Sequence, residues 1–246
     1  LAQTLALDTM TNANAKLDVA KMPYIGRVVT NIDTGVALPK TGIESFEDVR
    51  AKQYNVGASG GGSTTVLFPT ALKTYAGAKF KLVRGYSGTI DILLAMERGE
   101  IICRATRVTV HFSRESFLTW DKKGFDRHLV QAGEKRDPRL PDTPTIFELM
   151  EKYKTSEVGR RFARVVLAGD ELGRPMVAPP GVPSERVKIL REAYNKSLND
   201  PELLDEVKRS RLDMEPITGQ EIETIYKELM HQPPAVVDLV KKLDEN

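Results

Sequence analysis

Cysteine is almost absent from this sequence. Cys103 is the only cysteine among 246 residues, so no disulfide can form within the chain. No base stands beside it in the sequence, which favours a small buried residue over a nucleophile. Histidine is scarce as well, and His111, His128 and His231 are too scattered in the sequence to indicate a metal site. We therefore predict neither a metal nor a cofactor.

An excess of charge and a long apolar run are also missing. Lys and Arg number 36 against 34 Asp and Glu, and no long basic run occurs, so no nucleic-acid surface is indicated. No apolar run approaches the roughly 20 residues needed for direct insertion across a bilayer. The first ten residues, LAQTLALDTM, lack the basic stretch of a signal peptide. With 41% hydrophobic and 28% charged residues, the composition predicts one or two ordinary folded domains.

What the chain does contain is an alternation of short apolar runs with helical patterns, typical of an α/β protein. Extended structure is expected over residues 26–38, 53–59, 79–84, in one or two strands over 100–112, and near residue 129. Helices are expected over 43–51, 64–75 and about 89–98, in a connecting segment after 112, and near Thr145. Pro69 lies inside the second of these helices and should bend or restart it.

Two of these units share one arrangement of strand, Gly- and Ser-rich turn, and helix. Because parallel strands bring their carboxyl ends to one edge of a sheet, both helix N-termini should lie together there. Backbone N–H groups and the helix dipole then favour an anion. The candidate ligand-binding residues are Ser59, Gly60, Gly61, Gly62, Ser63 and Thr64 in the first turn, and Tyr86, Ser87, Gly88 and Thr89 in the second.

Packing alone could also account for these turns. The glycines could serve only close contact of strand against helix, and Tyr86 could simply be a packed tyrosine. A phosphate-binding P-loop is excluded because no lysine follows the glycines, and the spacing of a dinucleotide-binding loop is missing. If the turns do bind an anion, their neutral amide and hydroxyl donors suit a carboxylate.

The C-terminal third of the sequence is predicted to have a structural role, without ligand contacts. A strand near Met176 precedes four helical patterns, which begin near Pro183, Asp200, Gly219 and Pro233. Apolar residues recur along them at helical spacing, and such stripes usually pack into a core. The members of the stripes are Val187, Leu190, Tyr194, Leu198, Ile222, Ile225, Tyr226, Leu229, Val236, Val237, Val240 and Leu243.

Four segments occur in the order found in one protein family. They are GASGGGST, VRGYSGTIDILLAMERGEI, EKRDPRLPDTPTIFEL and RPMVAPPGVPSERVKILREAY. From about Leu38 to Val240 the sequence resembles the Bug or TctC family, the extracytoplasmic solute receptors of tripartite tricarboxylate transporters. The resemblance implies a periplasmic location and an α/β, type II-like periplasmic-binding-protein fold with an interlobe cleft. It further implies a first lobe from residues 1–36 and 169–246, a second lobe from 37–168, and two hinge crossovers.

The same resemblance implies a function. Such a receptor captures a small carboxylate, a di- or tricarboxylate or related organic acid, and delivers it to membrane permease subunits without catalysis. The alternative is an α/β enzyme that holds a phosphorylated or carboxylated metabolite at the same loops. We expect no catalytic residue, because the turns offer hydroxyls and amides rather than converging titratable groups. Nothing before Tyr24 resembles the family's first strand and Gly-rich loop, so we expect its N-terminal portion to be missing.

Overall fold

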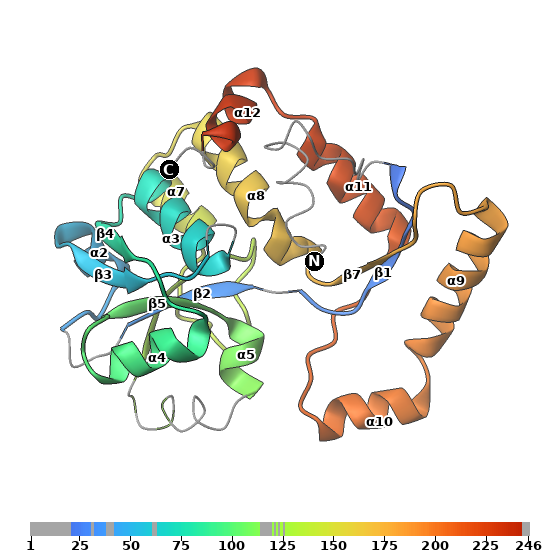
Figure 1. The fold of residues 1–246 in the computed structure, drawn as a ribbon, viewed down its shortest axis with the longest axis horizontal. Coiled ribbons are helices and arrows are strands. Elements are labelled where there is room, and N and C mark those ends of the chain that lie inside the picture. The colour runs from blue at the N-terminus through green and yellow to red at the C-terminus, as the bar shows by residue number, and fades with distance from the viewer. Residues whose placement is uncertain are drawn as a thin grey trace. The chain divides into compact units, whose positions relative to one another are not determined.

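The computed structural model describes residues 21–30, 32–37, 42–60, 63–113, 120, 122, 124 and 126–242 (Figure 1). The described strands are β1 (Tyr24–Arg27), β2 (Asp33–Ala37), β3 (Tyr54–Gly57), β4 (Phe80–Val83), β5 (Cys103–Arg107), β6 (Arg127–Gln131), β7 (Pro175–Val177) and β8 (Ile217–Thr218). The described helices are α2 (Phe46–Ala51), α3 (Thr64–Tyr75), α4 (Thr89–Glu97), α5 (Val108–Ser113), α7 (Ile146–Lys152), α8 (Glu157–Leu172), α9 (Ser184–Ser197), α10 (Pro201–Arg209), α11 (Gly219–Met230) and α12 (Pro234–Lys241).

The chain divides into two compact units. Unit 1 combines Leu1–Asn31 with Ala168–Asn246, and unit 2 is Ile32–Leu167. The lobes expected from the sequence changed over at residues 36/37 and 168/169. The units change over at 31/32 and 167/168 instead, because β2 pairs with β5 and β6 of unit 2.

Unit 2 is built on a five-stranded mixed sheet in the order β4-β3-β5-β2-β6. β3 is parallel to both β4 and β5, whereas β2 is antiparallel to β5 and β6. The main core packs α2, α3 and α7 against one face through side chains such as Phe46, Phe68 and Ile146. α4 and α5 cover the other face (Figure 1), where Met96 belongs to a smaller cluster. This layered arrangement is typical of α/β folds.

Unit 1 holds a three-stranded antiparallel sheet in the order β7-β1-β8. The rings of Tyr24 in β1 and Tyr226 in α11 stack at 4.7 Å between centroids. Gly26 leaves room for the ring of Tyr194 from α9, since a Cβ at Gly26 would lie 2.2 Å from Tyr194 Cε1. The Tyr194 hydroxyl donates to the Arg27 carbonyl oxygen at 2.5 Å. Aromatic packing thus fixes these helices on β1.

Most of the expected elements are confirmed, and the helix over 64–75 has the expected bounds. It continues through Pro69 and does not restart there. The extended structure expected over 26–38 is divided between β1 and β2, which lie in different sheets. The second half of the run 100–112 forms helix α5, although its β-branched residues favour a strand. Val108 N–H donates to the Ile32 carbonyl at 2.8 Å, which continues the pairing of β5 with β2 up to the first residue of α5. The expected connecting segment over 114–119 lies outside the described residues.

The C-terminal stripes are core for the most part. Their buried members are Val187, Tyr194, Ile222, Tyr226, Leu229, Val236 and Val240. Leu190 is an exception at 46% exposed, and α10 has no buried residue. Leu243 lies outside the described residues. Among the residues that the structure describes, no helix combines the length and apolar character needed to cross a membrane.

Candidate functional site

The two predicted turns lie at one edge of the sheet of unit 2. β3 and β4 are parallel neighbours, and their last residues, Gly57 and Val83, are in register. The Ala58 N–H donates to the Val83 carbonyl at 2.9 Å, which joins the strands where the turns begin. α3 and α4 follow these turns directly. The expectation that both helices start at the carboxyl ends of adjacent parallel strands is therefore confirmed.

A cluster of three hydroxyls closes the first turn. Ser59 Oγ donates to Ser63 Oγ at 3.0 Å, and both lie within hydrogen-bond distance of Thr65 Oγ1, at 2.9 and 2.7 Å. The Ser59 N–H also donates to Thr65 Oγ1 at 3.0 Å. Thr65 is buried and was not among the residues predicted from the sequence. The indication in the sequence was a threonine two residues after the N-cap serine, Ser63, and a search directed at glycines overlooks such a residue.

The remaining residues predicted for the first turn contribute differently. Gly60 is exposed, and a Cβ added to it would meet nothing within 4 Å. Thr64 is partly exposed and opens α3. Gly61 and Gly62 lie outside the described residues. The structure thus brings Ser59 and Ser63 together with Thr65 and leaves Gly60 as the open side of the turn.

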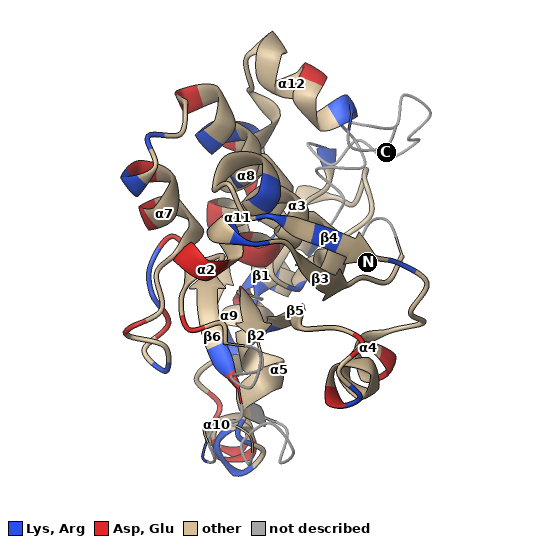
Figure 2. Cartoon of the chain, turned by 90° about the vertical axis from the view of Figure 1, so that its left-hand side faces the viewer, with Lys and Arg blue, Asp and Glu red and all other residues tan. Residues whose placement is uncertain are grey.

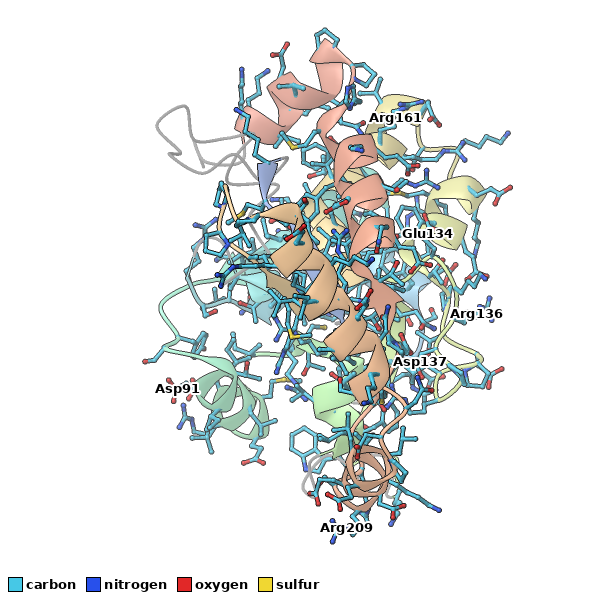
Figure 3. The ribbon with its side chains drawn as sticks, turned by 90° about the vertical axis from the view of Figure 1, so that its right-hand side faces the viewer. Asp91, Glu134, Arg136, Asp137, Arg161 and Arg209 are labelled. Atoms are coloured by element: carbon cyan, nitrogen blue, oxygen red, sulfur yellow. The ribbon has the colours of Figure 1, made fainter. Side chains whose placement is uncertain are left out.

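The second turn is held by packing rather than by hydroxyls. Tyr86 is partly buried against the cluster of Ala95, Met96 and Ile101, which supports the interpretation of this residue as a packed tyrosine. Gly85 has φ +106°, a conformation that favours glycine. Ser87 is exposed, and Gly88 and Thr89 are partly exposed at the start of α4. Asp91 follows in the first turn of α4, exposed on its outer side (Figure 3).

Neither helix uses an N-cap side chain to satisfy its first amides. The Ser63 side chain makes no capping hydrogen bond to α3, and the N-cap of α4 is Gly88, which has no side chain. Other helices do have side-chain caps: Thr145 accepts from the Glu148 N–H at 3.1 Å, and Thr218 accepts from the Glu221 N–H at 3.3 Å, although α9 and α12 begin at prolines that provide none. The first-turn N–H groups of α3 and α4 are thus not taken by a side-chain cap, which suits them to an anion.

Two arginines stand near this edge and were missed from the sequence. β5 is parallel to β3, with Gly57 in register with Arg104, so Arg107 at its end lies at the same edge as the turns. Arg107 is in register with Asp33 of β2, and Arg104 is 1% exposed. The sequence offered little signal, because both arginines lie in a run that reads as an ordinary strand. On the surface, basic and acidic residues mix on the same helices, as on α7 and α12 (Figure 2).

Cys103 is not suited to nucleophilic chemistry. Its side chain lies in the core of unit 2 and the residue is 2% exposed. Burial raises the pKa of the thiol to about 12, so it stays protonated at neutral pH. The expectation of a small buried residue is confirmed.

These observations define a class of fold before any particular relative. Solved structures similar to this chain include periplasmic solute-binding proteins, and the chain has their two-lobed α/β fold. No protein-family model matches the chain. A TctC solute-binding protein from Polaromonas superposes with a TM-score of 0.65 at 17% identity, covering 97% of this chain and 75% of that one.

Two further structures carry ligands. MatC from Rhodopseudomonas palustris, solved with malate, has a TM-score of 0.59 at 15% identity, over 95% of this chain and 75% of its own. An R. palustris protein solved with adipate has a TM-score of 0.59 at 18% identity, over 95% and 72%. In sequence, the UPF0065 protein of the gbd 5′ region in Cupriavidus necator is 23% identical over 97% of this chain and 72% of its own length. The predicted resemblance to Bug and TctC receptors therefore recurs in the structural comparison.

Proposed function

We propose that the protein is a non-catalytic receptor of the Bug and TctC type, which binds a small di- or tricarboxylate or a related organic acid. One observation carries the proposal. The N-termini of α3 and α4 follow adjacent parallel strands, and in neither helix does an N-cap side chain accept a hydrogen bond from the first-turn amides. In open α/β sheets this edge is where ligands bind.

The donors of the two turns, unlike Arg104 and Arg107 of β5, carry no formal charge, which favours a carboxylate over a phosphoryl group. Ser59, Ser63 and Thr65 present neutral hydroxyls, and the helix dipoles add only partial charges. A carboxylate is satisfied by a few such donors, whereas phosphate sites usually add Lys or Arg. Malate and adipate are the ligands of two proteins with this fold. Ser59, Gly60, Gly61, Gly62, Ser63 and Thr64 with Tyr86, Ser87, Gly88 and Thr89 remain our proposed contacts, to which the structure adds Thr65.

The biological setting belongs to the same proposal. Units 1 and 2 would be the two lobes of the receptor. The protein would work in the periplasm and pass its ligand to the permease subunits of a tripartite tricarboxylate transporter. A pair of crossings of the chain between the units, near residues 31 and 168, is what a hinge requires.

Ligand binding to the full-length protein tests this proposal. We expect malate, adipate or citrate to raise the unfolding temperature and to give a saturable calorimetric isotherm. At 100 times Kd, a ligand should add about 2.7 kcal/mol to the free energy of unfolding. Inorganic phosphate at the same concentration should add little. Binding of a phosphorylated metabolite with turnover, and of no carboxylate, would instead establish the enzyme alternative.

A further inference from the structure

Three side chains that are distant in sequence meet inside unit 2. His111 of α5, Asp126 just before β6, and His128 within β6 each place one potential ligand atom within 4.8 Å of the others. The side chains of His111 and Asp126 are fully buried, and His111 Nε2 lies 2.9 Å from Asp126 Oδ2. The two imidazole rings meet edge to face, 4.5 Å apart. Scattered histidines predicted no metal site, but the fold gathers two of the three.

The fold explains why these residues converge. Asp126 and His128 are two residues apart at the start of a strand, so their side chains project to the same face. β6 pairs with β2, and β2 pairs with β5, from which α5 continues directly. α5 covers this face of the sheet (Figure 1). His111 therefore reaches the two residues at the start of β6, and all three belong to one unit.

Hydrogen bonds fix which nitrogen of His128 faces the cluster with a lone pair. Thr34 Oγ1 donates its only proton to the Val130 carbonyl at 2.9 Å. The contact of 3.1 Å between Thr34 Oγ1 and His128 Nδ1 must then be donated by Nδ1–H. His128 Nε2 is left as a buried acceptor with no hydrogen-bond partner among the described residues. A metal-bound imidazole typically has this arrangement, with one nitrogen donating to an outer partner and the other available to bind.

The charges of the cluster leave a place for a cation. The Asp126 side chain is buried, and its Oδ2 lies 2.9 Å from Nε2 of the His111 imidazole. A buried carboxylate needs a positive partner at close range. The guanidinium of Arg104 is buried and interacts electrostatically with His128, so it repels a cation and limits the affinity the site can reach.

We propose that His111, Asp126 and His128 bind one divalent transition-metal ion, with Zn²⁺ as the favoured ion. Two imidazole nitrogens and one carboxylate oxygen are borderline donors that suit Zn²⁺, and they leave the fourth tetrahedral position for water. Zn²⁺ with ligands at about 2.0 Å separates tetrahedral ligand atoms by about 3.3 Å. The proposal requires their present spread, within 4.8 Å, to narrow to this value when the ion binds. The ion would tie α5 to β6.

The histidine count allows a test that leaves the cluster intact. His231, the third histidine, is exposed at the end of α11, where its Nδ1 contacts the Lys227 carbonyl. In the His231→Gln variant of this 246-residue chain, only His111 and His128 can supply imidazole. We expect this variant, after dialysis against Zn²⁺, to retain one ion, and X-ray absorption spectra to show two imidazole ligands on it. No retained ion, or one with no imidazole ligand, would overturn the proposal.

Variants of the cluster measure what each ligand contributes. His128→Asn and Asp126→Asn should each weaken Zn²⁺ binding by about 100-fold or more in competition with a chromophoric chelator. Thr34→Val, which removes only the outer partner, should cost about 10- to 100-fold. His231→Gln is the matched control and should bind like the parent. Circular dichroism establishes that each variant is folded, and the His231→Gln spectra decide the question if a buried variant is not. Equal Zn²⁺ affinity in all folded variants would show that the cluster is only a buried ion pair.

Discussion

The two turns at the edge of the unit 2 sheet occupy equivalent places but are built in opposite ways. In the first, Ser59, Ser63 and Thr65 bond to one another, so polar groups hold the loop. In the second, Tyr86 packs on an apolar cluster and Gly88 supplies an N-cap without a side chain. Topology therefore decides where a ligand-binding turn lies, whereas local side chains decide how rigidly its amides are held. Substitutions should separate these two contributions.

The largest effect on stability is expected at the position where the strand before the first turn packs against the helix after the second turn. Gly57 ends β3, and a Cβ there would lie 2.6 Å from Ile92 Cγ2 of α4. Gly57→Val should therefore push α4 off the sheet and lower the free energy of unfolding by about 1–3 kcal/mol, measured in urea. Gly60→Ala is the control, because its Cβ meets nothing within 4 Å. Equal stability of the two variants would mean that α4 does not depend on close contact with β3.

The second-largest effect on stability is expected from disrupting the cluster of three hydroxyls in the first turn. Thr65→Val keeps the shape of a buried side chain but removes the acceptor of the Ser59 N–H and two hydroxyl contacts. We expect a loss of about 1–3 kcal/mol in unfolding free energy, because a partly buried donor is left unpaired. Thr64→Val makes the same chemical change one residue earlier and should cost less. Similar losses at Thr64 and Thr65 would show that the cluster does not hold the turn.

Sequence reasoning succeeded where the signal was local. The bounds of α3 follow from the strand, the turn and the Ser63 N-cap, all within a short stretch of chain. Pairing of β3 with β4 followed from two consecutive βα units. Prediction from the sequence failed where distant segments meet: β5 places Arg107 beside the turns, and α5 brings the His111 ring against the His128 ring. Nothing near these residues in the sequence records the neighbour that the sheet order gives them.

Ser63→Ala tests the contribution of a single hydroxyl. The contact between Ser59 Oγ and Thr65 Oγ1, at 2.9 Å, survives this change, so the turn should keep its shape. If a carboxylate binds here, affinity should fall by about 0.5–1.5 kcal/mol in calorimetric titration, the worth of one net hydrogen bond. A loss of affinity above about 3 kcal/mol is at least twice the contribution of one net hydrogen bond, and it would mean that Ser63 does more than donate one bond.

The smallest effect should come from Ser87→Ala in the second turn. Ser87 is exposed, so the free energy of unfolding should stay within about 0.5 kcal/mol of the parent protein. The informative measurement is carboxylate affinity. If the α4 amides hold the ligand and Ser87 adds one exposed donor, affinity should fall by less than Ser63→Ala produces. In a double variant of Ser63 and Ser87 the loss should depart from the sum of the two single losses if both serines contact one carboxylate, since additivity holds only for sites that share no partner. An affinity unchanged by Ser87→Ala and by a bulky Gly88→Val would place the ligand at the first turn alone.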